Sequence, residues 1–264
     1  NLTLLTDLYE LTMMQGYFHA KDANETVIFD AFYRTNPDGN GFAITAGLEQ
    51  VVEYIENLHF DKEDIDYLRT TGLFGEDFLE YLSTFKFTGD IYAIPEGTVV
   101  FPREPLVKVI APIMQAQLVE TAILNINHQS LIATKTSRIV HAARGDGVME
   151  FGLRRAQGPD AGIYGARAAM IAGCIGTSNV LCGQMFDVPV KGTHAHSWIM
   201  SFPDELTAFR TYARLYPTAC ILLVDTYDTL NSGIPHAIQV FKEMRAEGIP
   251  LTFYGIRMDS GDLA

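Results

Sequence analysis

The sequence predicts an α/β protein in which an N-terminal α+β domain, residues 1–117, precedes an incomplete or irregular TIM-like (β/α) barrel, residues 118–264, truncated at its C-terminal side. Two observations predict this fold. After residue 145, short apolar runs alternate with segments of helical period, as in βα units around a parallel sheet. The units are also about 30 residues long, which suits a barrel. An open doubly wound sheet is the alternative. The runs are Val148–Phe151, Asn179–Cys182, Cys220–Val224 and Leu251–Ile256.

The N-terminal part mixes helices and strands. Thr6 and Asp7 can cap a first helix whose apolar spacing is imperfectly amphipathic. Between residues 88 and 111, β-branched residues are interrupted by prolines and glycine, which indicates short antiparallel strands. The expected elements before that segment are a helix from Leu5 to Phe18, a buried strand from Val27 to Tyr33, a turn at 36–41 and a helix from Ala46 to Leu58; a long helical stretch from Pro112 to Ala143 follows it.

Two helices are expected in the C-terminal part. From Ile234 to Glu247 the apolar residues fall on one face and the charged residues on the other, and Gly248 ends the pattern. The segment from Asp204 to Tyr216 repeats this arrangement.

Composition narrows the class of protein. With 264 residues, 48% of them hydrophobic, the chain can bury a large core, which excludes a disordered protein. The 19 basic and 32 acidic residues leave a net charge of −13, which argues against binding nucleic acid or an anionic membrane surface. Three cysteines without a CxxC pair indicate neither a disulfide framework nor a thiolate metal site, as in the reducing cytoplasm. No apolar run approaches the roughly 20 residues that cross a bilayer, and no signal-peptide pattern opens the chain.

Polar side chains follow three of the predicted strands. Because the carboxyl ends of parallel strands meet at one edge of a sheet or barrel, these residues form a candidate active site. Arginines pair bidentately with carboxylates or phosphates, and neighbouring aspartates hold Mg²⁺ or orient imidazoles. We therefore expect an anionic ligand accompanied by a divalent cation. The clusters are Gly152–Arg155, Asp225–Asp228 and Arg257–Asp262, and a segment with two histidines, Gly192–Trp198, lies between two of the units.

Each cluster also has a plainer interpretation. The arginines at 154–155 could lie in a solvated loop, and Asp225 and Asp228 could cap the helix that begins near Ile234. His194 and His196 could ligate zinc, although no third ligand stands out by its spacing, or either could be a structural histidine. Agreement among three strand ends favours a functional site.

Essentially the whole chain resembles nicotinate phosphoribosyltransferases, which are type II phosphoribosyltransferases of NAD salvage. The resemblance implies an enzyme that joins nicotinate to 5-phosphoribosyl 1-pyrophosphate, giving nicotinate mononucleotide and pyrophosphate, with accompanying ATP hydrolysis. Seven motifs in the family's order carry it: Leu5–Glu10, Gly41–Ala43 with Gly47–Glu49, Ile132–Lys135, Glu150–Arg155, Gly192–Ser197, Leu223–Asp228 and Arg257–Asp262.

The resemblance also implies the catalytic residues. His196 matches the family's histidine that ATP phosphorylates transiently, so it is the expected phosphohistidine. Asp225 is implied to hydrogen-bond the imidazole and to fix its tautomer. Asp259, with the turn at Ser260 and Gly261, is implied to bind the ribose hydroxyls and phosphates of 5-phosphoribosyl 1-pyrophosphate.

The remaining residues implied by the resemblance bind nicotinate and phosphate. Phe151 is expected to stack on the pyridine ring, opposite Tyr9 from a partner subunit. The arginines divide between two tasks: Arg154 and Arg257 would line the pyridine and phosphate sites, whereas Arg138, together with Arg34 from the partner, would bind the phosphates of 5-phosphoribosyl 1-pyrophosphate. A homodimer with shared active sites follows from these assignments.

Ser178 bears on the choice between acid and amide. In related nicotinamide-using enzymes an aspartate follows a Gly-Thr pair and accepts a hydrogen bond from the amide, whereas here Ser178 follows Gly176 and Thr177. A carboxylate at this position would repel nicotinate, so serine favours the acid. ATP and Mg²⁺ are the implied cofactors, and no dedicated protein metal site is expected. The alternatives are a nicotinamide phosphoribosyltransferase and a non-catalytic ligand-binding paralogue. Because the family continues past Asp262, the chain is expected to be part of a longer protein.

Overall fold

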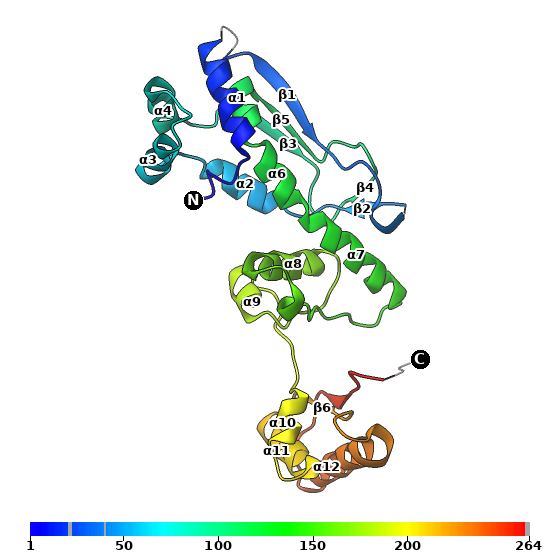
Figure 1. Cartoon of the computed structure of the whole chain (residues 1–264). Coiled ribbons are helices and arrows are strands. Elements are labelled where there is room, and N and C mark those ends of the chain that lie inside the picture. The colour runs from blue at the N-terminus through cyan, green and yellow to red at the C-terminus, as the bar shows by residue number, and fades with distance from the viewer. Residues whose placement is uncertain (21–22, 40, 262–264) are drawn as a thin grey trace. The chain divides into compact units, whose positions relative to one another are not determined.

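The chain is a mixed α/β protein in a computed structural model that describes residues 1–20, 23–39 and 41–261. It forms two compact units, Asn1–Val190 and Lys191–Ala264 (Figure 1). The α/β prediction is confirmed at this level, but no closed sheet is found among the described residues. The predicted boundary at residues 117/118 lies inside a helix of the first unit and stays a prediction. Asn40, within the predicted turn, and Asp262, which ends the last motif, lie outside the described residues.

An antiparallel sheet forms one side of the first unit. Its strand order is β1-β5-β3, and a separate two-stranded ladder joins β2 to β4. The antiparallel strands predicted between residues 88 and 111 are therefore confirmed. Along β1, exposed and half-buried residues alternate, so the prediction of a buried strand was wrong, because only one face of this edge strand packs on the helices. The strands are β1 (Thr26–Ala31), β2 (Ala43–Ile44), β3 (Asp90–Ala93), β4 (Val99–Val100) and β5 (Val107–Pro112).

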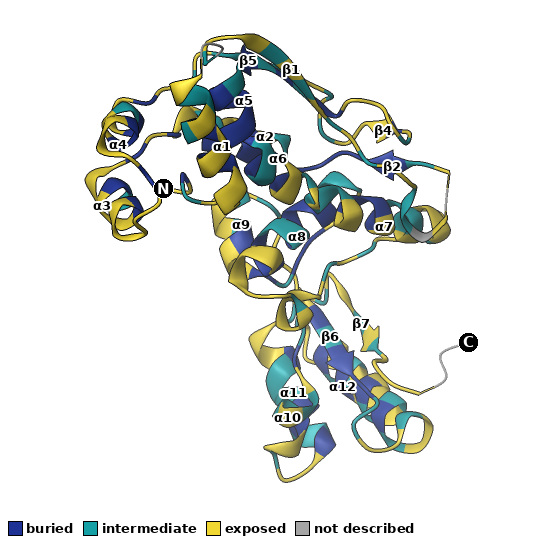
Figure 2. Ribbon diagram, turned by 45° about the horizontal axis from the view of Figure 1, so that its top comes forward, coloured by how far each residue is buried: buried dark blue, intermediate teal, exposed yellow. Residues whose placement is uncertain are grey.

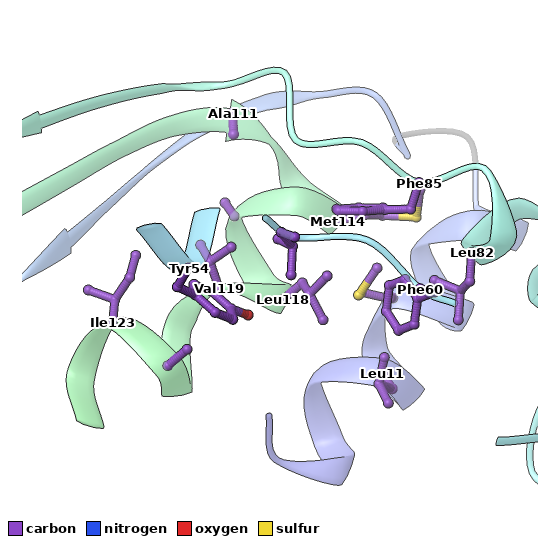
Figure 3. Packing of buried hydrophobic residues seen from close by; sticks show 14 of the residues in the cluster. Leu11, Tyr54, Phe60, Leu82, Phe85, Ala111, Met114, Leu118, Val119 and Ile123 are labelled. Carbon is purple, nitrogen blue, oxygen red and sulfur yellow. The ribbon is translucent and has the colours of Figure 1, made fainter. Parts of the chain in front are cut away.

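Helices cover the inner face of this sheet. Helix α5 is buried along most of its length, as Figure 2 shows, and contacts both β1 and β5. Leu11, Tyr54 and Leu118, from three different helices, belong to one apolar cluster together with the buried Phe60 (Figure 3). The helices of this part of the chain, including those that do not cover the sheet, are α1 (Leu8–His19), α2 (Leu48–Glu56), α3 (Lys62–Thr70), α4 (Glu76–Ser83), α5 (Ile113–Leu118), α6 (Glu120–Asn127) and α7 (Gln129–Ala142).

The rest of the first unit contains short helices beside isolated parallel bridges. Glu150 pairs with Thr177, and Thr177 pairs with Val190, both in parallel. The predicted strand at Asn179–Cys182 was wrong: Asn179 is the N-cap of α9, and its side chain accepts a hydrogen bond from the Cys182 N–H at 3.1 Å. Asparagine stabilises a helix start in this way, and the short apolar run alone cannot distinguish a buried strand from a buried helix. These elements are η2 (Leu153–Arg155), α8 (Pro159–Ile171) and α9 (Val180–Phe186).

The second unit is a βα arrangement. Strands β6 and β7 pair in parallel, with Cys220 opposite Tyr254, as the apolar runs predicted. The two predicted amphipathic helices are confirmed as α11 and α12, and both pack on the strand core through residues such as Phe209. None of the helices in the described parts of the chain is long and apolar enough to span a membrane. The elements are α10 (His196–Met200), α11 (Glu205–Leu215), β6 (Cys220–Leu223), η3 (Thr229–Gly233), α12 (Ile234–Ala246) and β7 (Tyr254–Arg257).

Candidate functional site

An imidazole–carboxylate pair lies at the end of β6. His196 is the first residue of α10, and its Nε2 lies 3.1 Å from Oδ1 of Asp225. The Asp225 side chain is only 3% exposed, whereas that of His196 is 39% exposed. Because a carboxylate only accepts hydrogen bonds, Nε2–H is the donor, and in the tautomer that this bond selects Nδ1 carries the lone pair. The pair predicted from the resemblance is therefore in hydrogen-bonding contact, with one ring nitrogen left for a ligand.

The second oxygen of Asp225 is held by the loop after β7. Its Oδ2 accepts hydrogen bonds from the backbone N–H of Asp259 at 2.8 Å and from the Ser260 hydroxyl at 2.7 Å. Burial by itself would raise the pKa of Asp225, but these hydrogen bonds and the one from the imidazole outweigh it and hold the pKa below its ordinary value. Asp225 is therefore ionised at neutral pH and oriented from two sides.

The two aspartates of the loop after β6 make different contacts. Asp228 accepts a hydrogen bond from the N–H of Asn231 at 2.9 Å and so caps η3, whereas α12, the helix that both aspartates could have capped, begins after Gly233 without a side-chain cap. The loop ends at Gly233, where a Cβ atom would lie 1.9 Å from the carbonyl oxygen of Val224. The chain can return this close to the end of β6 only because the residue is glycine.

His194 has a structural position. It is buried, its Nε2 accepts a hydrogen bond from the N–H of Leu223 at 3.2 Å, and its ring meets Tyr212 edge-on at 4.6 Å. Burial is the main cause that lowers the pKa of His194 below its ordinary value, so the ring is neutral. Because this nitrogen is already an acceptor for the backbone, His194 is held as part of the β6 packing and not as a ligand.

Arg257 belongs to the same cluster at the strand ends. It donates to the Thr193 hydroxyl at 2.7 Å and to Oδ1 of Asp259 at 2.6 Å. Gly261, with φ of 85°, turns the chain after Ser260. The second unit thus brings together the predicted residues His196, Asp225, Arg257, Asp259, Ser260 and Gly261.

The carboxylates near β6 do not form a metal site by themselves. Asp225 is surrounded by donors, Asp228 caps η3, and Asp259 pairs with Arg257. No group of three or more histidine, cysteine or acidic side chains that could hold a metal is found in the described parts of the chain. The zinc interpretation of the histidine pair has no support, and the donor set suits a Mg²⁺ ion only if a phosphorylated ligand supplies most of its oxygens.

The first unit brings Phe151 close to Ser178. The N–H of Ser178 donates to the carbonyl of Glu150 at 3.1 Å, and Phe151 is the next residue after Glu150. The ring of Phe151 is 37% exposed, and Arg154 lies exposed on η2. The aromatic ring of Phe151, the cation of Arg154 and the hydroxyl of Ser178 therefore follow neighbouring parallel bridges. These three kinds of group suit a binding site for a small planar anion.

Three further predicted residues occupy different places in the first unit. The Tyr9 hydroxyl donates to Oε1 of Glu120 at 3.2 Å, and the side chain is 45% exposed. Arg34 lines a pocket of about 340 Å³ with residues of α6 and α7. Arg138 donates to the carbonyl of Phe42 at 3.1 Å and lies over its ring at 5.7 Å. Their predicted contacts with ligands and with a partner subunit stay predictions.

Two contacts escaped the sequence-based interpretation. Arg257 donates a hydrogen bond to the Thr193 hydroxyl, and the Thr177 hydroxyl donates one to the carboxylate of Glu150. All four residues lie in or beside the quoted motifs, but spacing along the chain cannot predict a hydrogen bond between two separate strand ends. The only available signal was the position of each threonine directly after a glycine at the end of a βα unit.

Fold and site together define a mixed α/β protein in which a buried carboxylate orients a half-exposed imidazole, and the loop that holds this carboxylate also carries an ion pair with Arg257. Such an arrangement suits anionic, phosphorylated ligands. The chain belongs to the nicotinate phosphoribosyltransferase family: the family's N-terminal domain matches residues 4–127, and the family domain that follows matches residues 147–264.

Individual relatives agree with this assignment. A nicotinate phosphoribosyltransferase of Mycobacterium tuberculosis is 49% identical over 98% of this chain and 55% of its own length. One from Bacillus subtilis is 48% identical over 100% of this chain and 53% of its own length. The crystal structure of human nicotinic acid phosphoribosyltransferase aligns with a TM-score of 0.86 at 33% identity, covering 98% of this chain and 61% of the human one. The chain thus spans about half the length of the curated relatives it matches.

Proposed function

We propose that this chain is the greater part of the active site of a nicotinate phosphoribosyltransferase. The whole protein joins nicotinate to 5-phosphoribosyl 1-pyrophosphate, releases nicotinate mononucleotide and pyrophosphate, and couples the reaction to ATP hydrolysis. The observation that carries the proposal is the His196–Asp225 pair, with Asp225 held by Asp259 and Ser260, in a chain of this family.

His196 accepts the phosphoryl group of ATP in this proposal. The lone pair on Nδ1 attacks the γ-phosphorus while the bond to the ADP oxygen breaks, and the ring gains positive charge. Asp225 balances that charge through the hydrogen bond at Nε2, where its oxygen lies 3.1 Å away. Its lowered pKa keeps it negative during this step.

The glycosyl transfer uses the strand-end residues differently. A pyridine nitrogen is already a nucleophile, so the step needs positioning and charge neutralisation more than a strong base. Phe151 offers an aromatic face, and Arg154, Arg257 and Arg138 supply cations for the nicotinate carboxylate and the phosphates. Ser178, which adds no negative charge, favours nicotinate over nicotinamide.

The barrel and the dimer belong to the same proposal. Strands β6 and β7 and the parallel bridges at Glu150 and Thr177 would be strands of a (β/α) barrel that the remaining length of the protein completes. In support, β7 is an edge strand of a two-stranded sheet, its Ile256 is 42% exposed, and Phe253, directly before the strand, is 66% exposed. Tyr9 and Arg34 would serve the active site of the partner subunit in a homodimer, and Mg²⁺ would bind together with the phosphorylated substrates in the cytoplasm.

A labelling experiment on the full-length protein tests the role of His196. Incubation with γ-labelled ATP should give an acid-labile phosphoryl group that the His196→Ala variant lacks. The control is His19→Ala, which changes an exposed histidine at the end of α1 and should keep the label. A label that persists in His196→Ala would exclude this residue as the acceptor.

Steady-state kinetics separate the alternatives. The full-length protein should release pyrophosphate when given nicotinate, 5-phosphoribosyl 1-pyrophosphate, ATP and Mg²⁺. A higher kcat/KM for nicotinamide than for nicotinate would identify the amide-using enzyme instead. Ligand binding without pyrophosphate release would identify a non-catalytic paralogue.

A further inference from the structure

Glu150 connects the two loops that carry Phe151 and Ser178. One carboxylate oxygen accepts a hydrogen bond from the backbone N–H of Gly152, and the other accepts one from the Thr177 hydroxyl at 2.6 Å. The first contact lies directly after Phe151, and the second lies directly before Ser178. One side chain therefore contacts both loops within two residues of the proposed nicotinate-binding groups.

Thr177 is buried completely and uses its hydroxyl twice. It donates to Glu150 and accepts a hydrogen bond from the N–H of Asn179 at 3.0 Å, where α9 begins. A buried hydroxyl that loses its acceptor costs free energy, so this bond strongly restricts the geometry. The bond also involves an ionisable acceptor, and hydrogen bonds to charged groups are the stronger ones.

The backbone bonds alone do not set the loop geometry. The N–H of Glu150 donates to Gly176 at 2.9 Å, and Ser178 donates back to Glu150 at 3.1 Å, which sets the register of the two strands. The side-chain bonds from Glu150 to Gly152 and Thr177 add a constraint directly after Phe151 and directly before Ser178. Since small displacements of a binding group weaken a rigid site, this second set of bonds matters for the ligand.

We propose that Glu150 and Thr177 are positioning residues for nicotinate, which hold Phe151 and Ser178 in one relative geometry and so help to determine the preference for the acid over the amide. The proposal rests on the proposed function and deepens it. Both oxygens of Glu150 are occupied by donors within the protein, so its role is exerted through the two loops.

The test is steady-state kinetics of the full-length protein carrying Thr177→Val, which keeps the shape of the side chain and removes the hydroxyl. We expect KM for nicotinate to rise about tenfold, the change produced by about 1.4 kcal/mol, while kcat changes less than about threefold. The ratio of kcat/KM for nicotinate to that for nicotinamide should fall by a similar factor. Thr177→Ser keeps the hydroxyl and should restore values near the wild type.

Glu150→Gln supplies an independent variant of nearly the same shape. Because both substitutions act on the same bond, the double variant should raise KM no more than the larger single effect, whereas independent effects would multiply. Glu150→Gln also keeps an acceptor for Gly152, so it decides the proposal even where Thr177→Val fails to fold.

Thr45→Val is the matched control. Thr45 is likewise buried, donates to the carbonyl of Pro95 at 2.7 Å and accepts from the N–H of Thr98 at 3.1 Å, away from the two loops. This control should lower Tm as much as Thr177→Val does but leave KM and the acid-to-amide ratio unchanged. Equal KM values for the Thr45 and Thr177 variants would overturn the positioning role. A wild-type protein that releases no pyrophosphate would overturn the proposed function itself, and with it this inference.

Discussion

Glu10 should make the first unit less stable as the pH rises from 4.5 to about 7. Its side chain is fully buried and accepts hydrogen bonds from the N–H and the hydroxyl of Thr121, at the start of α6. Burial, the largest cause, outweighs these hydrogen bonds and raises the pKa of Glu10 from 4.5 to about 7.

The sign of the effect follows from proton binding. Between pH 4.5 and pH 7 the folded protein holds the Glu10 proton and the unfolded chain has released it. Stability therefore falls as the pH rises through this window, and above pH 7 the loss is complete. Raising a pKa from 4.5 to about 7 corresponds to about 3 kcal/mol, since each tenfold change in proton affinity is worth about 1.4 kcal/mol.

Glu10→Gln should remove this dependence, because glutamine has the same shape, keeps an acceptor for Thr121 and carries no charge at any pH. Relative to the wild type, the variant should gain about 3 kcal/mol of unfolding free energy between about pH 4.5 and pH 8. Urea titrations of both proteins at both pH values, followed by far-UV circular dichroism, measure the unfolding free energies. Subtracting the wild-type value from the variant value at each pH cancels the contributions of all other titrating groups.

Two controls make the result specific. Glu80→Gln changes an exposed carboxylate on α4 and should alter the unfolding free energy by less than about 0.5 kcal/mol at either pH. Trp198, the only tryptophan, lies in the second unit, so its fluorescence transition should not respond to Glu10→Gln. If the wild type and Glu10→Gln differ by the same free energy at both pH values, the argument from burial is wrong.

Three further predictions, two of them with a control substitution, test other parts of the structure. Gly233→Ala places a Cβ atom 1.9 Å from a backbone carbonyl oxygen and should lower the free energy of unfolding of the second unit, followed by Trp fluorescence, by about 2 kcal/mol or more. The control Gly255→Ala, whose Cβ atom would lie 3.5 Å from its nearest neighbour, should lower it by less than about 1 kcal/mol. Equal losses in the two variants would contradict the close approach at Gly233. Arg167→Leu removes a 9%-exposed cation from two glutamates and should cost about 3 kcal/mol in urea. Arg210→Leu removes a 40%-exposed cation from Glu243 and should cost much less, so similar costs for the two variants would refute the importance of burial. If His196 is phosphorylated as proposed, Asp225→Asn should slow that step by about 100-fold in rapid-quench labelling, and an unchanged rate would exclude an orienting role for Asp225.

Local sequence patterns predicted the elements whose stability depends on their own residues. The apolar face of α12 and the glycine after it define a helix in any context, and the proline-interrupted segment from 88 to 111 forms the antiparallel strands expected of it. The parallel pair β6–β7 follows from two apolar runs separated by a helix.

The errors have a common physical cause. Asn179 begins a helix because its side chain caps the N–H of Cys182, and a run of four residues is too short for its periodicity to exclude that outcome. Strand β1 is half exposed because burial depends on which elements cover each face of the sheet, and a strand's own residues do not determine that.

The sequence by itself determined the family of this protein, and with it the choice of His196 and Asp225, because those residues lie in contiguous motifs. Only the tertiary structure decided that Asp225 meets the imidazole while Asp228 caps a helix, and that Ser260 holds Asp225 from the other side. The residues in these contacts are 29 and 35 positions apart, whereas the Asp228 cap spans three. A cap is set by neighbours along the chain, but a hydrogen bond between two strand ends forms only when packing of the core brings those ends together.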